Sequence, residues 1–251
     1  MELTSITTSD GTAEALFVLP VADPSAGPWP GVLLGMDALG VRPRLEEMAR
    51  EIASWGYAVL VPNALYRTLS VAEVMPAEPL LSDEARSAFF ARVGPSLQGL
   101  TAEQVEADLD AWIGFLRASD RVAAGPLGFV GFCFGVRVGL RAAGRYPDDV
   151  AAVAGFHGGQ VVTDAPDSPH RSLATAKARF VLLHADNDAG MTPPNVETLE
   201  AAFEAAGLTA VNEIVPGARH GYTMADAAVY HPEATARAFR ETRALLADTL
   251  A

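Results

Sequence analysis

The 251-residue sequence is poor in cysteine, in basic residues and in long apolar runs. A single cysteine, Cys133, excludes an internal disulfide framework and a multi-cysteine zinc site. Lysine and arginine total 18 against 31 aspartate and glutamate residues, and the net charge is −13. This balance argues against nucleic acid as a partner, because phosphates require a basic surface. No apolar run approaches the roughly 18 residues of a membrane span, so no membrane partner is expected.

The first 20 residues lack a basic segment followed by a long apolar one. We therefore expect no signal peptide and a cytoplasmic protein. Half of the residues are hydrophobic and 20% are charged, which is typical of a globular chain and not of a disordered one. Neither a monomer nor a homodimer is favoured by the sequence.

Short apolar segments alternate with segments of helical periodicity along most of the chain. The apolar segments predict strands over 12–20, 31–36, 57–62, 126–132, 150–156, 178–185 and 209–216. The amphipathic segments predict helices over 42–56, 102–118, 134–146, 193–207 and 232–249, with Thr101 as the N-cap of the second. Residues 63–100 have no clear strand period and are interpreted as an insertion with one helix over 83–94. The alternation predicts a single α/β domain over 1–251, with a mostly parallel sheet flanked by helices on both faces.

The residues that follow the predicted strands are the first candidates for a site. Ligands of parallel sheets bind at the carboxyl ends of the strands. The candidates are Asp37 to Gly40, Cys133, His157, Asp186 to Asp188, and His220.

The segment GFCFG (131–135) lies between a predicted strand and a predicted helix, with cysteine where a G-x-S-x-G motif has serine. Gly131 and Gly135 leave room for a sharp turn, and the helix N-terminus favours a Cys133 thiolate. The backbone N–H of Phe134 can donate to an oxyanion. No G-x-S-x-G occurs in the chain, so no serine competes for this role. The alternative is that Cys133 is a small buried hydrophobic residue.

His220 follows the last predicted strand and is the favoured base, because nucleophile, acid and histidine come in this order in α/β-hydrolases. The acid is expected in HADNDAGMTPPN (184–195), which offers Asp186 and Asp188. Asp188 is favoured, since the following AGMTP is close to the D-x-x-V-P run that often follows this strand in the superfamily. The alternative is that either aspartate only caps the turn before the next helix. The other histidines do not follow the last strand: His157, His170, His184 and His231.

These motifs together resemble the dienelactone hydrolase family of α/β-hydrolases. The resemblance is carried by MDALGVRP (36–43), GFCFG, HADNDAGMTP (184–193) and RHGY (219–222), and it extends from the strand at 31–36 to the final helix. A cysteine nucleophile is typical of this family. The resemblance implies hydrolysis of the lactone ring of carboxymethylenebutenolides, without a metal or an organic cofactor.

The resemblance also implies roles for residues after the first core strand. Asp37 stands where the family usually has a glutamate that contacts the thiol and helps to form the thiolate, and the alternative is a simple turn residue. The N–H of Ala38 would be the second oxyanion donor beside that of Phe134. Val136 replaces a family glycine, and Met224 replaces an arginine that binds the substrate carboxylate. Arg86 and Arg92 are the candidates for a second family arginine.

Two functions are consistent with these residues. The first is a hydrolase of a small-molecule ester or lactone that works through Cys133, His220 and Asp188 and a thioacyl-enzyme. The alternative is a non-catalytic small-molecule binding module on a hydrolase scaffold. A Rossmann oxidoreductase is disfavoured because no G-x-G-x-x-G follows a predicted strand. A hydrolytic metal site is disfavoured because no H-E-x-x-H or similar spacing occurs.

Overall fold

The computed structural model describes residues 1–20, 26–78 and 80–250. It divides into two compact units. The first unit contains Met1–Ala124 and Ala225–Ala228, and the second contains Gly125–Met224 and Val229–Ala251. The prediction of one domain over 1–251 stays a prediction.

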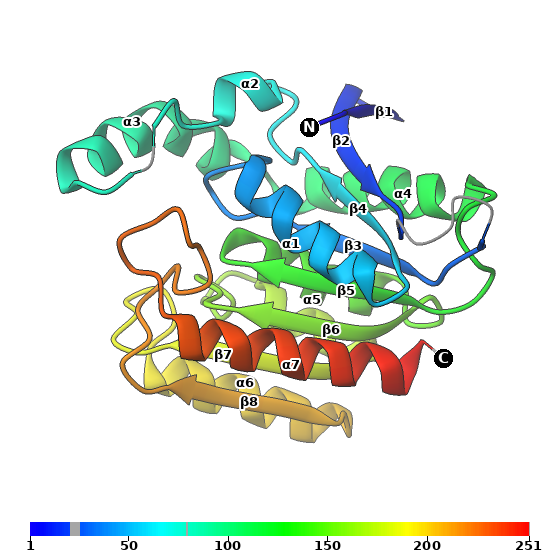
Figure 1. The fold of residues 1–251 in the computed structure, drawn as a ribbon. Helices are drawn as coiled ribbons and strands as arrows, with labels where there is room; N and C mark the ends of the chain where they lie inside the picture. The colour runs from blue at the N-terminus through cyan, green and yellow to red at the C-terminus, as the bar shows by residue number, and fades with distance from the viewer. Residues whose placement is uncertain (21–25, 79, 251) are drawn as a thin grey trace. The chain divides into compact units, whose positions relative to one another are not determined.

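The first unit contains four paired strands: β1 (Thr4–Thr8), β2 (Gly11–Val18), β3 (Gly31–Gly35) and β4 (Ala58–Pro62). Their order is β1-β2-β4-β3, with β3 parallel to β4 and the other two pairs antiparallel. Helix α1 (Pro43–Ser54) lies on one face of these strands and α4 (Ala102–Ala118) on the other (Figure 1). The insertion after β4 contains α2 (Val71–Val74) and α3 (Asp83–Gly99).

Local sequence explains where these two covering helices begin and which face they bury. Pro43 occupies the first turn of α1, where its missing N–H costs nothing, and apolar residues such as Leu45 and Ile52 line the buried face. Thr101 caps α4 by accepting from the N–H of Gln104, whose side chain accepts in turn from the N–H of Thr101. The predicted N-cap is confirmed.

The second unit contains four parallel strands in the order β5-β6-β7-β8. Their bounds are Leu127–Phe132, Val150–Phe156, Arg179–Ala185 and Ala210–Val215. Helices α5 (Phe134–Arg145) and α6 (Pro193–Ala206) cover one face, and α7 (Pro232–Thr249) covers the other (Figure 1). β5 is buried along its whole length, as expected for a parallel strand covered on both sides. The carboxyl ends of these strands therefore hold the loops that carry Cys133, His157 and Asp188.

Every predicted strand and helix is confirmed to within two residues at each end, except the one in the insertion. The fold class, an α/β protein with mostly parallel strands flanked by helices, is confirmed as well. Three elements were missed: β1, α2 and a 3₁₀ helix over Pro169–Thr175. The helix predicted over 83–94 continues to Gly99 as α3. β1 buries only Ile6, so its pairing with β2 leaves little periodicity in the sequence.

Candidate active site

Cys133 forms the turn between β5 and α5. Its backbone has φ 51° and ψ −109°, a conformation that L-residues rarely adopt. A Cβ atom on Gly131 would lie 2.6 Å from the carbonyl carbon and oxygen of Gly135, so the turn excludes a side chain at Gly131. The N–H of Cys133 donates to the carbonyl of Phe156 at 3.0 Å, which ties the turn to the end of β6. The sharp turn expected from GFCFG is therefore present.

Val136, which directly follows the GFCFG turn, packs against two glycines. A Cβ atom on Gly155 or on Gly158 would lie 2.9 Å from a carbon of the Val136 side chain. The first turn of α5 therefore packs closely on β6 and its following loop.

His220 joins Cys133 to Asp188 by two hydrogen bonds. Its Nε2 lies 3.1 Å from the Sγ of Cys133, and its Nδ1 lies 2.6 Å from the Oδ2 of Asp188. The N–H of Gly190 donates to the other oxygen of Asp188 at 2.8 Å. Asp186 accepts instead from the N–H of Gly217 at 2.9 Å. Of the two candidate acids, Asp188 is therefore the one that contacts the imidazole.

The electrostatics of this cluster favour a charged imidazole. Burial alone would lower the pKa of His220, but hydrogen bonds to Asp188 and Cys133 and the negative charges of both groups raise it to about 10. Burial would raise the pKa of Asp188, but the hydrogen bond and positive charge of His220 lower it below its usual range. The carboxylate of Asp188 therefore favours a proton on His220.

His157 forms the wall beside His220. It is fully buried, with its ring centroid 5.3 Å from that of His220 and 5.1 Å from that of Tyr222. Its Nε2 lies 2.7 Å from the hydroxyl oxygen of Thr223. His157 thus supports the imidazole without belonging to the hydrogen-bonded chain. His157 is one of the candidates that follow a predicted strand, and the structure places it beside His220.

The other histidines have structural partners. His184 pairs with Asn212 at 2.7 Å, His170 pairs with Ser168 at 2.7 Å, and His231 caps α7.

Backbone strain is concentrated around this cluster. Four residues other than glycine have positive φ in the described part of the chain: Cys133, His157, Gln160 and Asn187. Each follows the carboxyl end of β5, β6 or β7. Strained conformations of this kind gather at functional sites, where the surrounding structure holds them.

Arg137 and Gln160 were not identified from the sequence. Arg137 lies in the first turn of α5, with its guanidinium carbon 4.8 Å above the ring of Phe134. Its Nη1 donates to the Oε1 of Gln160 at 3.1 Å. The spacing of four residues between Cys133 and Arg137, one helical turn, is the sequence feature that could have indicated it.

Asp37 and Ala38 belong to the first unit, in the loop after β3. Both residues are buried, and the two carboxylate oxygens of Asp37 accept from Nη1 and Nη2 of Arg42 at 2.6 and 3.0 Å. Arg42 also donates through Nε to Asp226 at 2.5 Å. Burial disfavours the charged guanidinium, but both carboxylates outweigh this and raise the pKa of Arg42 above its usual range. The sequence analysis missed Arg42 as the partner of Asp37.

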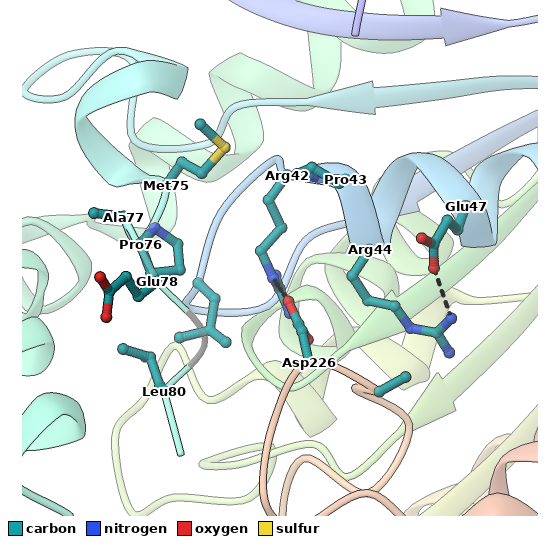
Figure 2. A pocket seen from close by; sticks show the side chains of 12 residues that line it. Arg42, Pro43, Arg44, Glu47, Met75, Pro76, Ala77, Glu78, Leu80 and Asp226 are labelled. Atoms are coloured by element: carbon teal, nitrogen blue, oxygen red, sulfur yellow. Dashed lines mark hydrogen bonds and ion pairs between the residues drawn. The ribbon is translucent and has the colours of Figure 1, made fainter. Parts of the chain in front are cut away.

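Arg42 and Asp226 also line a cavity of about 450 Å³ within the first unit. Figure 2 shows the two side chains in the cavity wall, with the ion pair of Arg44 and Glu47 beside them. The remaining wall is largely apolar and includes Leu80.

One of the two arginines considered as substrate ligands, Arg92, has backbone partners. Arg92 donates to the carbonyl oxygens of Glu73 and Val74. Met224 is 1% exposed and lies in the core. No group of three or more His, Cys, Asp or Glu residues that could hold a metal ion occurs in residues 1–20, 26–78 and 80–250. Within the same ranges, no helix combines the length and apolar character that a membrane crossing requires.

Comparison with known proteins gives a consistent result. The model of the dienelactone hydrolase family matches residues 16–250. A protein of Methylorubrum extorquens named "Putative carboxymethylenebutenolidase" is 27% identical over 217 residues, which are 85% of this chain and 69% of the relative. A protein of Escherichia coli K12 with the same name is 27% identical over 213 residues, which are 82% of this chain and 72% of the relative.

Solved structures agree with these relatives. The crystal structure of a "Putative Dienelactone Hydrolase" from Klebsiella pneumoniae has a TM-score of 0.81 and 26% identity, and the match covers 98% of this chain and 97% of that one. The dienelactone hydrolase of Anabaena variabilis, at 18% identity and a TM-score of 0.68, shows likeness of fold alone.

The chain belongs to the dienelactone hydrolase family. The predicted α/β-hydrolase fold and the predicted enzyme class, a dienelactone hydrolase-like hydrolase, are therefore confirmed.

Proposed function

We propose that this chain hydrolyses a carboxylic ester or lactone through Cys133, His220 and Asp188, with a thioacyl-enzyme as the intermediate. The observation that carries the proposal is the contact of one imidazole with both partners, at 3.1 Å to the thiol sulfur and 2.6 Å to the carboxylate. A thiol, a base and a carboxylate that orients the base are the parts that nucleophilic acyl transfer needs.

Acylation begins after the proton of the Cys133 thiol has moved to Nε2 of His220. The thiolate of Cys133 attacks the carbonyl carbon, an S–C bond forms, and the π electrons move onto the carbonyl oxygen. When the tetrahedral intermediate collapses, the C–O bond to the alcohol breaks and His220 protonates the leaving oxygen. In a lactone the alcohol stays attached to the acyl group.

Deacylation uses the same imidazole in its neutral form. Nε2 of His220 takes a proton from water, and the resulting hydroxide attacks the thioester carbonyl. The C–S bond breaks, and the sulfur leaves as the thiolate that was present at the start. The carboxylate of Asp188 keeps Nδ1 protonated and stabilises the positive charge that returns to the ring.

The oxyanion is assigned to backbone donors. The first N–H groups of a helix have no partner within the helix, and that of Phe134 directly follows the nucleophile. Ala38 as second donor and Asp37 as the group that helps to form the thiolate are carried over from the family resemblance. Both roles belong to the proposal.

The substrate class follows from the relatives. Their name, carboxymethylenebutenolidase, describes hydrolysis of an unsaturated lactone that carries a carboxylate. We infer a small-molecule ester or lactone as the substrate here, with a carboxymethylenebutenolide as the first compound to examine. Met224, in place of the family arginine, predicts weaker dependence on the substrate carboxylate.

The test compares native chain with Cys133→Ala on a dienelactone, a neutral lactone, a p-nitrophenyl ester and a thioester. We expect native turnover of at least one of them and no turnover by Cys133→Ala. His220→Gln and His170→Gln form a matched pair, because only His220 contacts the thiol. Mass spectrometry of the quenched native reaction should show the acyl group on the chain.

Retained activity in Cys133→Ala would contradict the proposed nucleophile. Equal losses in the two histidine variants would contradict the assigned base. Absence of turnover of all four compounds by the native chain would favour the binding-module alternative.

A further inference from the structure

The positive charge of Arg137 has few hydrogen-bond partners and no carboxylate beside it to balance it in the described part of the chain. Its Nε is buried and has no hydrogen-bond partner, and its one side-chain hydrogen bond goes to the neutral amide of Gln160. Among the residues that the structure describes, no carboxylate forms an ion pair with it. Its guanidinium also stacks on Phe134, the residue after the nucleophile.

Three features disfavour a positive charge at this place. Burial lowers the pKa of Arg137, and the neighbouring charge of Arg141 lowers it further. The first turn of α5 is the positive end of the helix dipole, where cations are destabilised. One negative group acts in the opposite direction, since a thiolate at Cys133 raises the pKa of Arg137.

The loops that hold His220 also hold this guanidinium. Gln160 accepts from Arg137, and its own N–H donates to the carbonyl of Gly190 at 2.7 Å. The N–H of Gly190 donates to Asp188, the partner of His220. Gln160 has φ 55°, a strained conformation that the surrounding loops hold.

We propose that Arg137 is a positioning residue whose guanidinium, stacked on the residue after Cys133, supplies a local positive charge that attracts negatively charged reactants to the sulfur. Its place in a catalytic cycle rests on the proposed function. Its effect on the sulfur does not require turnover and can be measured in the native chain without a substrate.

The test uses alkylation of the sulfur by neutral iodoacetamide and by anionic iodoacetate. In both reactions the thiolate forms an S–C bond and iodide leaves. Cys133 is the only cysteine, so the mass of the intact chain counts one adduct. Because the same thiolate attacks both reagents, the ratio of the two rate constants cancels the thiolate fraction and reports the local charge.

The variants are Arg137→Gln, Arg137→Lys and Arg179→Gln. Arg179 begins β7, at the end of the parallel strands opposite to the loops that carry Cys133, and is 45% exposed. Arg179→Gln removes the same charge as Arg137→Gln and is therefore a control matched for net charge. We expect Arg137→Gln to reduce the iodoacetate to iodoacetamide ratio by about 3- to 10-fold, the effect of one nearby charge at a partly exposed site. Arg137→Lys should retain most of the native ratio, and Arg179→Gln should retain all of it.

An unchanged ratio in Arg137→Gln would overturn the proposal, as would an equal decrease in Arg179→Gln. If circular dichroism shows that Arg137→Gln does not fold, Arg137→Met provides the same comparison, because its flexible side chain keeps apolar contact with Phe134. A decreased ratio in a chain that hydrolyses none of the compounds supports this inference and contradicts the proposed function. Cys133-dependent hydrolysis with an unchanged ratio would support the proposed function and contradict this inference.

Discussion

Replacing Asp188 by asparagine removes a negative charge from the imidazole while keeping the shape of the side chain. The Asp188 side chain is 8% exposed, and its Oδ2 lies 2.6 Å from Nδ1 of His220. An amide oxygen can still accept from Nδ1, so the tautomer and ring orientation can persist. What disappears is the charge that stabilises the imidazolium and helps to raise the pKa of His220 to about 10.

The size of the effect follows from the kind of bond that changes. A hydrogen bond to a charged group contributes about 1.5–3 kcal/mol, roughly twice a neutral one. If this contribution is lost only in the transition state, kcat falls by about 10- to 150-fold, at 1.36 kcal/mol for each tenfold change. Rotation of the amide, which would point its NH₂ group at Nδ1, would invert the tautomer and deepen the loss to about 10⁴-fold.

The assay is steady-state hydrolysis of whichever panel compound the native chain turns over, with Asp186→Asn as control. Asp186 is on the same loop but accepts only from the N–H of Gly217, a bond that an amide oxygen can keep. Asp186→Asn should stay within about twofold of native kcat/KM. Urea unfolding of both variants checks that folding is retained.

A kcat for Asp188→Asn within threefold of native would refute the role assigned to the Asp188 carboxylate. A matching loss in Asp186→Asn would show that the loop, and not the contact with His220, is responsible.

Three further outcomes are expected. Gly131→Ala should destabilise the chain by about 1–3 kcal/mol and abolish hydrolysis, because its Cβ would lie 2.6 Å from backbone atoms of Gly135. In the same urea titration the control Gly114→Ala, on an exposed helix face, should stabilise the chain slightly. Arg42→Met should lower the free energy of unfolding by about 3–5 kcal/mol, because it leaves two carboxylates without their cation. Arg50→Met, which breaks an exposed ion pair, should lower it by about 0.5 kcal/mol. Equal losses in the two variants would contradict this reasoning. His220 binds its proton more tightly in the folded state than at its ordinary value of 6.5, so the stability it contributes is complete below about pH 6.5 and is lost as the pH rises through about 10. Urea unfolding at several pH values should therefore show a smaller decline over this range in His220→Gln than in the native chain.

The sequence alone determined the order and nature of most elements, because the apolar period of a strand or helix is a local property. It also determined the sharp turn at GFCFG, since the steric need for Gly131 arises within five residues. β1 escaped prediction because its stability comes from backbone pairing with β2, and only Ile6 is buried.

Contacts between distant segments were decided by the tertiary structure. The sequence offered both Asp186 and Asp188 as the acid, and the path of the loop brings Asp188 to His220 and Asp186 to a backbone amide. It left Asp37 as either a turn residue or a thiol partner, and the fold pairs both oxygens of that carboxylate with Arg42.

In the sequence, only its place one helical turn after Cys133 sets Arg137 apart. A long side chain acquires its environment from the residues that pack against it, and the partners of this guanidinium, Phe134 and Gln160, come from a helix and from a separate loop. Local periodicity therefore determined the scaffold, and the positions of the charges around the thiol depended on how the loops at the carboxyl ends of the strands pack together.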